Sequence, residues 1–570
     1  MGHKQLGGKP IVVFLALLLL SACAPQPQSV PSPDTASNLA SQPSERPTLR
    51  LGTQREPSTF SVLLAAAAES SGGLRILKQI PHNQLVVQND RGAWVPQLAA
   101  EQLAVENGTW RVNPDGSMDT VWKLRPHAKW QDGAPFTSDD LLFSFTVYKD
   151  REIPNRGGTS LALMASASAP DPLTFVVHWS APYVFADQAP GLEPLARHLF
   201  EELYQTDKTQ FVNSSLLRED FVGLGAYRLV SWQQGSHFEF APFDDYYLGR
   251  PPLGRVIVRV IPDLNTMVAN IMAGTLDVLM DVGVSLETGL EVRDRWQGTG
   301  NQVLVVPGAK PGYIDFQHRP EFARPVNGPT NRTVRQAFLH GLDRESLAEL
   351  LTAGLSPVPD SWVDVNDEQY SQLASAIPRY PYNPARAQQL LAEAGWVRGT
   401  DGVLVHQTTR DAFQMEARFA DDGESEKLVT VAANNWRSLG MQINLLELTP
   451  SLKSNNEMFA KFSGVHGRTS PTIPFGSNYL HSKGGASPEN RWTGSILGYN
   501  NPKVDELLDR YVVTIDPNAR LAVHRELLQE VMGDVALMPT HWRNDPILAV
   551  SGVTGIKGRE AWNFQEWSRQ

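Results

Sequence analysis

The chain has 570 residues, a formal net charge of −11, and a composition that is 41% hydrophobic and 19% charged. These fractions are ordinary for globular proteins, and a chain of this length is expected to form two or three domains. The acidic balance argues against a nucleic-acid groove or a basic membrane-binding face, so we expect no nucleic-acid partner. Because Cys23 is the only cysteine, the chain cannot form an internal disulfide.

The first residues are typical of an exported lipoprotein. Two lysines and no acidic residue precede ten apolar residues at 11–20, a run too short to span a bilayer, which needs about 20 residues. The sequence LSAC at 20–23 resembles the lipobox of bacterial lipoproteins, in which the cysteine is lipidated and becomes the mature N-terminus. A core thiol and a catalytic nucleophile are the alternatives, but no core begins at Cys23 and no base lies near it in the sequence. We therefore predict a signal peptide over 1–22 and a palmitate-type lipid anchor at Cys23.

Residues 23–47 are predicted to form a flexible tether. They are rich in Pro, Ser and Gln and poor in large apolar residues, so they cannot bury enough surface to fold. A flexible segment of this length has a mean reach of roughly 25–30 Å. We expect a monomeric globular body in the cell envelope, held at the outer face of the cytoplasmic membrane or in a periplasm. The sequence leaves inner-membrane and outer-membrane sorting open.

Alternating patterns predict the strands of the first half in chain order. Strands are expected at TLRLGTQ (48–54), LTFVVHW (173–179), AYRLVSW (226–232), HFEFAPF (237–243) and RVIVRVIP (255–262). Between the first two, residues 121–150 pass from a strand through a turn at Asp132-Gly133 to a helix. Thr137 and Ser138 are the candidate N-cap residues of that helix.

The second half is more helical. Helices are expected at 331–351, 383–396 and 501–511. Asn383 is the expected cap of the second, Pro384 occupies its first helical position, and Gly395 ends it. The mixed pattern predicts α/β lobes built on separate sheets.

Five stretches also follow one another in a familiar order. They are VPQLAAE with VWKLRPHAKWQDGAPFTSDDLLFSF, then GLGAYRLVSWQQG with FDDYYLGRPPLGRVIVRVIPD, then TVRQAFLHGLDRESL, YNPARAQQLLAEAGW and YNNPKVDELLDRY. Together they cover most of residues 48–545 and resemble the bacterial extracellular solute-binding proteins of family 5, the peptide- and nickel-binding group that serves ABC importers.

The resemblance implies a periplasmic-binding-protein-like α/β fold of two lobes, with a hinge between them and an extra subdomain in the first. We place lobe I at 48–80, 215–305 and 535–570, the subdomain at 81–214, and lobe II at 306–534. The resemblance further implies a substrate-binding lipoprotein that captures a small solute in the interlobe cleft and delivers it to a membrane permease. An oligopeptide is one candidate solute.

Site residues are expected where the sequence departs from the family. In peptide-binding relatives, an aromatic and acidic element before the last stretch helps to position the peptide, whereas residues 463–499 here are basic, with Glu489 as the only acid. Arg468 or Arg491 can pair with a ligand carboxylate, and a solvated loop is the alternative for each. For the aromatic residues the alternative is a core position. The predicted ligand contacts are Gln54, Ser58, Arg468, Tyr479, Arg491, Trp492 and Trp542.

Catalytic motifs are missing from the sequence. It has no H-E-x-x-H, G-x-S-x-G or phosphate-loop motif, and its 13 histidines show no metal-ligand spacing. GLGAYRL at 223–229 lacks the third glycine of a dinucleotide-binding loop. We therefore expect no enzyme, no cofactor and no metal. A sensor or scaffold lipoprotein that uses the same cleft is the main alternative, and a secreted hydrolase is a further one.

Overall fold

The structure is a computed structural model of the chain. It describes residues 46–570 apart from 62, 65–72, 91–92, 155–158, 189–191, 281–283, 366, 368, 421, 469–478 and 559–560. The predicted signal peptide, Cys23 and nearly all of the predicted tether lie outside the described residues. Residues 46–570 form one compact unit. Among its described helices, none is both long enough and apolar enough to cross a membrane.

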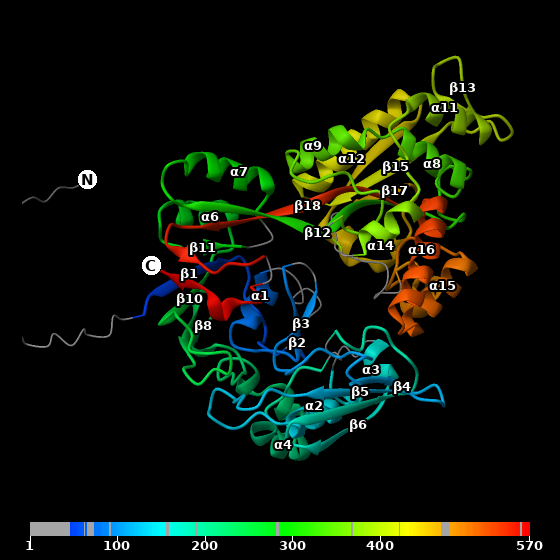
Figure 1. Cartoon of the computed structure of the whole chain (residues 1–570). Coiled ribbons are helices and arrows are strands. Elements are labelled where there is room, and N and C mark those ends of the chain that lie inside the picture. Colours follow the sequence, from blue (N-terminus) through cyan, green and yellow to red (C-terminus); the bar gives the residue numbers. More distant parts are fainter. Residues whose placement is uncertain are drawn as a thin grey trace, which may run out of the picture. The chain divides into compact units, whose positions relative to one another are not determined.

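Ten strands form one sheet that runs through both predicted lobes (Figure 1). In spatial order they are β16 (Gln442–Leu448), β15 (Gln414–Ala420), β17 (Val465–Arg468), β12 (Gln302–Phe316), β18 (Leu537–Ala549), β11 (Val278–Leu279), β1 (Thr48–Thr53), β10 (Arg255–Val260), β9 (His237–Pro242) and β8 (Tyr227–Gln233). The expectation of separate sheets for the two lobes is therefore wrong. The antiparallel strands β12 and β18 are 15 and 13 residues long, so they extend from one lobe into the other and make the sheet continuous.

The strands predicted for lobe I are confirmed as β1, β8, β9 and β10. Apolar and polar residues alternate along these strands, so one face of the sheet is apolar and buried. Val256 and Val258 of β10 lie in this buried face together with Leu49 of β1 and Phe240 of β9. On the other side, α6 (Leu264–Met272) and α7 (Leu286–Arg295) form a small apolar cluster with β11 and β18. Lobe I therefore lies against the ends of the same two strands that reach lobe II.

The predicted subdomain has its own antiparallel sheet, in the order β4 (Trp110–Val112), β5 (Met118–Lys123), β7 (Thr174–Trp179) and β6 (Met164–Asp171). The helices α2 (Ser138–Lys149), α4 (Arg197–Thr206) and α5 (Lys208–Val212) share one core with it. The predicted helix start is confirmed, because Thr137 is the N-cap and its N–H donates to Asp140 Oδ2 at 2.9 Å. The turn at Asp132-Gly133 is confirmed as well.

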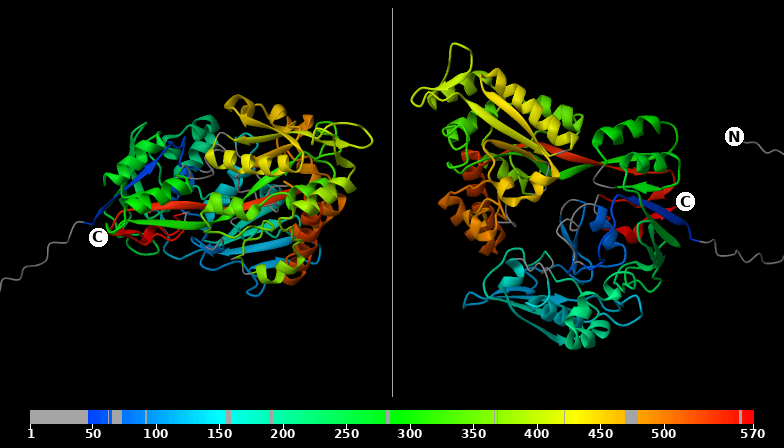
Figure 2. Two further views of the ribbon diagram at one scale, coloured as in Figure 1. Left: turned by 90° about the horizontal axis from the view of Figure 1, so that it is seen from above. Right: turned by 180° about the vertical axis from the view of Figure 1, so that it is seen from behind.

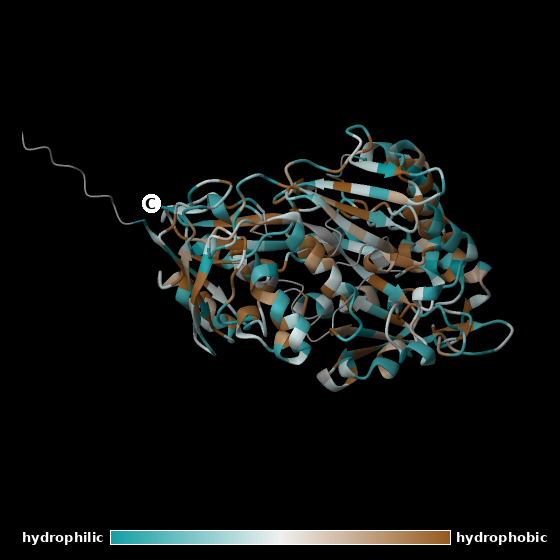
Figure 3. Cartoon of the chain, turned by 90° about the horizontal axis from the view of Figure 1, so that it is seen from below, coloured by the Kyte–Doolittle hydropathy of each residue, from teal (hydrophilic) through white to brown (hydrophobic). Residues whose placement is uncertain are grey.

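Lobe II carries helices on both faces of its strands (Figure 2). Its main helices are α8 (Arg332–His340), α9 (Arg344–Thr352), α11 (Pro384–Glu393), α12 (Gly423–Ser438), α15 (Pro502–Val513) and α16 (Pro517–Asp534). The predicted caps are confirmed: Asn383 accepts from Arg386 N with Pro384 in the first turn, and Asn501 does the same for α15. The buried apolar residues of α8, α11 and α12 belong to one cluster and those of α15 and α16 to another, and apolar and polar segments are interspersed over the whole chain (Figure 3).

The remaining elements are short. They are β2 (Val86–Gln88), β3 (Trp94–Pro96), β13 (Trp396–Arg398), β14 (Leu404–His406), β19 (Val553–Thr554), β20 (Ser568–Arg569), α1 (Gly73–Gln79), α3 (Thr159–Leu163), α10 (Tyr370–Leu373), α13 (Pro450–Ser454) and α14 (Asn456–Ala460). The exact boundaries of the lobes and the subdomain stay predictions, and the names are used below for the predicted ranges.

Gln131 joins the subdomain to lobe I. Its side-chain Nε2 lies 3.0 Å from the carbonyl oxygens of Pro81, Gly225 and Tyr227, and its Oε1 accepts from Gly223 N at 3.0 Å. Both glycines allow the close approach of two backbones, because a β-carbon at 223 would lie 1.9 Å from Pro81 O and one at 225 would lie 2.5 Å from Ile80 O. The glycines of GLGAYRL therefore serve this joint.

Replacing Gln131 by Leu is expected to lower the free energy of unfolding by about 2–3 kcal/mol, because buried backbone groups lose their partners. Denaturant unfolding followed by tryptophan fluorescence measures this. Gln389→Leu on the exposed side of α11 is the control and is expected to leave stability nearly unchanged. If Gln131→Leu is as stable as the wild type, the hydrogen bonds of Gln131 do not stabilise the contact between the subdomain and lobe I.

Candidate ligand-binding site

The β12–β18 pairing is irregular at its middle. Residues 302–307 of β12 pair with 544–549 of β18 at the end of the ladder beside the other lobe I strands, and 313–315 pair with 537–539 at the end beside the lobe II strands. The register shifts between Pro307 and Pro311 and again between Gly312 and Tyr313. Prolines lack the N–H that a ladder needs, and bulges of this kind bend strands. Gly312 lies so close to His541 that a β-carbon there would be 2.3 Å from the imidazole. The irregular stretch is therefore the natural hinge.

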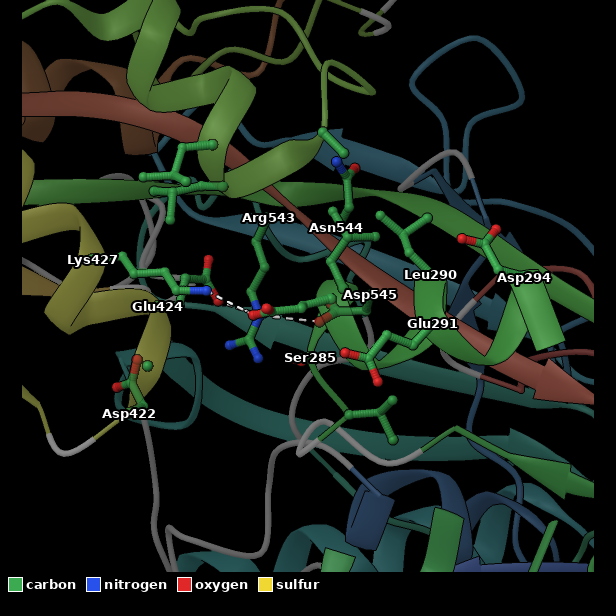
Figure 4. A pocket seen from close by; sticks show the side chains of 17 residues that line it. Ser285, Leu290, Glu291, Asp294, Asp422, Glu424, Lys427, Arg543, Asn544 and Asp545 are labelled. Atoms are coloured by element: carbon green, nitrogen blue, oxygen red, sulfur yellow. Dashed lines mark hydrogen bonds and ion pairs between the residues drawn. The ribbon is translucent and has the colours of Figure 1, made fainter. Parts of the chain in front are cut away.

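A pocket of about 830 Å³ lies beside this hinge (Figure 4). One wall comes from α7 of lobe I, and the other comes from the end of α9 and the start of α12 in lobe II. Residues 543–545 of β18 also line it. Both lobes therefore contribute to this pocket, which we call the hinge pocket.

Several charges of the hinge pocket are paired with one another. Glu424 Oε1 lies 2.8 Å from His541 Nε2, and Arg543 Nε lies 3.0 Å from Asp545 Oδ1 and 3.5 Å from Glu424 Oε2. Burial raises the pKa of Glu424, but the His541 hydrogen bond and the Arg543 charge outweigh burial and leave this pKa below its ordinary value. The exposed pair Lys427 Nζ–Glu287 Oε2, at 2.7 Å, joins α12 to α7. These pairs join the two lobes, but the lining as a whole is acidic, because Glu291, Asp294 and Asp422 add to the paired carboxylates; the pocket contains none of the predicted site residues.

Arg468 and Tyr479, two of the predicted contacts, meet at a carboxylate that the sequence analysis missed. Asp315 of β12 is fully buried; its Oδ2 lies 2.6 Å from Arg468 Nε and accepts from Tyr479 Oη, also at 2.6 Å. The Arg468 guanidinium carbon lies 4.3 Å from the centre of the Tyr479 ring and 5.3 Å from that of Tyr313. We call Tyr313, Asp315, Arg468 and Tyr479 the Asp315 cluster.

The Asp315 cluster holds a neutral ion pair. Burial lowers the pKa of Arg468, but the charge of Asp315 outweighs burial and raises this pKa above its ordinary value, so the guanidinium stays charged. Burial raises the pKa of Tyr479 and of Tyr313, so both phenols stay protonated. Asp315 therefore already balances the positive charge that the sequence analysis assigned to a ligand carboxylate.

Arg491 and Trp492 lie in a different cluster. Both have left-handed backbones, with φ of 56° and 59°, and Arg491 is exposed. The Trp492 ring centre lies 4.5 Å from Lys461 Nζ and 6.1 Å from that of Phe322. This ring packs against the small apolar cluster around Phe462. The structure thus separates two of the four predicted lobe II contacts from the other two.

The lobe I residues Gln54 and Ser58 lie in the loop that follows β1. Gln54 Nε2 donates to Pro262 O at 3.4 Å, and Ser58 is exposed. Between them, Glu56 accepts from Trp232 Nε1 and from Gly235 N. The loop is therefore held against lobe I by its own contacts.

Trp542 and Tyr313 each carry a buried donor without a partner. Trp542 of β18 is 3% exposed, Tyr313 of β12 is fully buried, and neither the indole Nε1 nor the phenol Oη has a hydrogen-bond partner in the described part of the chain. Position 542 pairs with Pro311, two residues before Tyr313. Because native buried donors are nearly always paired, each of these two groups calls for a partner, which can be water or an acceptor from outside the chain.

The family comparison decides which class of protein this is. The model of the bacterial extracellular solute-binding proteins, family 5 (middle region), matches residues 94–487. The chain belongs to this family. It is an extracellular or periplasmic solute-binding protein of an ABC transporter and not an enzyme, and its fold is the two-lobed α/β fold of periplasmic binding proteins.

Similar proteins cover almost the whole chain. The oligopeptide-binding protein AppA of Bacillus subtilis is 22% identical over 568 residues, which is 98% of this chain and 97% of that protein. NikZ from Campylobacter jejuni in complex with Ni(L-His) has a TM-score of 0.70 at 20% identity and covers 92% of this chain and 100% of its own. NikA from Brucella suis in complex with Fe(III)-EDTA has a TM-score of 0.72 at 19% identity, with the same coverage. These structures show the fold.

Arg468→Met is expected to lower the free energy of unfolding by about 3–5 kcal/mol, because it leaves the buried carboxylate of Asp315 without its counter-charge. The double variant Asp315→Asn with Arg468→Met removes both charges and is expected to recover most of that loss. Denaturant unfolding of Arg468→Met, Asp315→Asn and the double variant measures the coupling. Additive effects of the two substitutions would contradict the ion pair.

Proposed function

We propose that this protein is the lipid-anchored capture component of an ABC importer and that it binds a small polar solute, peptide-like or a metal chelate, between its lobes beside the Asp315 cluster. The observation that carries the location is the pair of orphan donors, Tyr313 Oη and Trp542 Nε1, on the two strands that join the lobes. Both donors suit acceptor oxygens of a solute, such as carbonyl or carboxylate oxygens.

The charge of the Asp315 cluster restricts the solute further. With Asp315 and Arg468 paired, the cluster presents no net charge, so recognition there uses aromatic faces and neutral hydrogen bonds. Tyr479 and Trp542 remain proposed contacts, and Arg468 is proposed to orient Tyr479 through Asp315. Arg491, Trp492, Gln54 and Ser58 remain proposed contacts on the evidence of the sequence.

Release to a permease is the role we favour over a sensor or scaffold role. Membership of a family of ABC solute-binding proteins supports delivery, and the irregular hinge supplies the movement that delivery requires. The test is deletion of the candidate permease genes in the host: if delivery is the role, the strain loses uptake of the solute while the purified protein still binds it. Unimpaired uptake of the bound solute in that strain would favour the sensor role.

Solute binding is expected to stabilise the protein by about 2.7 kcal/mol at a concentration 100 times the dissociation constant. A thermal-shift screen of oligopeptides, histidine–nickel and iron–EDTA chelates, and glycosides measures this with the full chain. A folded protein that no compound class stabilises would count against capture.

For any compound that binds, Tyr313→Phe is expected to weaken binding about tenfold while leaving the melting temperature of the free protein unchanged or slightly higher. The variant removes only a hydroxyl without a partner, so the free protein loses no hydrogen bond. Tyr227→Phe is the matched control: Tyr227 is equally buried, but its Oη accepts from Leu253 N at 3.3 Å. This control is expected to lose stability and keep affinity. Calorimetric titration measures the affinities. If Tyr313→Phe keeps the wild-type affinity and Tyr227→Phe loses affinity, Tyr313 is not part of the binding site.

The anchor is tested separately. Cys23→Ser is expected to abolish incorporation of labelled palmitate and to leave the precursor uncut by the lipoprotein signal peptidase, because the thiol is the acceptor of the lipid. Metabolic labelling and the size of the product on a gel measure both effects. Fatty-acid incorporation into the variant would overturn the lipobox.

A further inference from the structure

The subdomain touches lobe II at a point far along the chain from the hinge. Val184 N donates to Val512 O, near the end of α15, at 2.8 Å, and the rings of Phe185 and Tyr511 lie 6.3 Å apart. Ile515 of lobe II belongs to the hydrophobic core of the subdomain. We call residues 183–188 with 511–520 the latch. β12 and β18 join the lobes at the hinge, so the latch is a second connection, and a hinge movement that separated the subdomain from lobe II would have to break it.

The latch contains a carboxylate in an unfavourable place. Asp187 Oδ1 is buried and has no hydrogen-bond partner in the described part of the chain. The nearest opposite charge, Arg520 of α16, directs Nη1 to the carbonyl oxygens of Thr514 and Ile515, at 3.2 and 2.9 Å. Burial raises the pKa of Asp187 to about 6, although the Arg520 charge opposes this. In the latch this side chain therefore takes up a proton at a higher pH than a carboxylate in water does.

The other groups around the latch whose pKa values are shifted do not change charge in the same range. Burial raises the pKa of Tyr511 on α15, so this phenol stays neutral. Burial lowers the pKa of His524 on α16 to about 4, so its imidazole is neutral from about pH 5 upward. Burial also raises the pKa of Tyr183, the first residue of the latch, so this phenol stays neutral as well. Asp367 acts on Tyr511 from its exposed loop. Asp187 is thus the group that couples the latch to pH.

We propose that Asp187 makes closure of the lobes proton-dependent: the latch closes with a neutral Asp187 and opens more readily once this carboxylate is charged. Opening exposes Asp187 to water, where a carboxylate has its ordinary pKa near 3.8. The proton is therefore bound more tightly in the closed form, so closure is favoured as the pH falls through about 6 and disfavoured above it. The extension to solute capture rests on the function proposed above, whereas the effect on closure does not.

The size of the effect follows from the two pKa values. Between pH 7.5 and pH 5.0, the ratio of closed to open molecules is expected to rise about tenfold, and the affinity for a solute held by the closed form is expected to rise by up to the same factor. Asp187→Asn keeps the shape of the side chain and cannot ionise. It is expected to show a pH-independent ratio, equal at pH 7.5 to that of the wild-type sequence in acid.

The closure test needs no solute. Cys23 is the only native cysteine, so a full chain with Cys23→Ser, Thr209→Cys and Lys503→Cys accepts two spin labels, one on the exposed surface of α5 in the subdomain and one on α15. Pulsed electron resonance then gives the populations of short and long distances at pH 5.0 and 7.5. Asp220→Asn, at an exposed carboxylate, is the control and is expected to keep the pH dependence of the parent. Populations that do not change with pH in the parent, or that change equally in Asp187→Asn, would overturn the proposal.

The link to capture is measured with trialanine and with histidine–nickel as probes, by calorimetric titration at the same two pH values. Tighter binding in acid that Asp187→Asn removes supports the link. A probe that binds with the same affinity at both pH values, while the distances shift, overturns the link. Failure of both probes to bind weighs against the proposed solutes, and the distance populations alone then decide the role of Asp187.

Discussion

The pairing of β12 with β18 is the constraint on which the rest of the structure depends. One half of the ladder is part of the lobe I sheet and the other half is part of the lobe II sheet, so neither lobe has an independent sheet. The register breaks only where the strands pass between the lobes, at 307–313. A ladder that is regular at both ends and irregular in the middle concentrates bending in the middle, where few hydrogen bonds have to change. Opening and closing then become movements of two rigid bodies.

The buried arginines near the hinge are already paired with carboxylates of the protein, so their charges are not available to pair with a solute. Arg468 is balanced by Asp315, and Arg543 by Glu424 and Asp545, because an unpaired buried charge costs several kcal/mol. Tyr313 and Trp542 beside the hinge carry neutral donors without a hydrogen-bond partner in the described part of the chain. Burying a neutral donor without a partner costs less free energy than burying an unpaired charge, so such groups are tolerated in the free protein. The proposed site would therefore gain from acceptor groups of the solute and would not depend on the net charge of the solute.

Local signals allowed much of the fold to be predicted. Helix caps and alternating strands involve residues within a few positions of one another, and these predictions were confirmed at Thr137, Asn383 and β10. The candidate site depends on distant pairs: Asp315 lies 153 residues before Arg468 and 164 before Tyr479 in the sequence. The one signal for Asp315 was an acid between Ile314 and Phe316 in a strand-like stretch. The continuous sheet was missed because the stretch PGAKPG interrupts β12 with residues that usually end strands.

The sequence identifies the family well and the solute poorly. The reason is a difference between the contacts of Gln131, which join the subdomain to lobe I, and the contacts within the Asp315 cluster. At the joint, Gln131 bonds to backbone groups and the glycines at 223 and 225 let two backbones approach, so few other residues can make these contacts. In the Asp315 cluster the contacts are made between side chains. Replacing both partners of such a pair can preserve the packing and still change the hydrogen-bonding groups and charges available to a solute. Physical constraint is thus strongest where the parts of the protein meet and weakest where a solute would bind. Sequence motifs in proteins of this class therefore identify the fold. The chemistry of the solute has to be inferred from buried polar groups that have no partner within the protein.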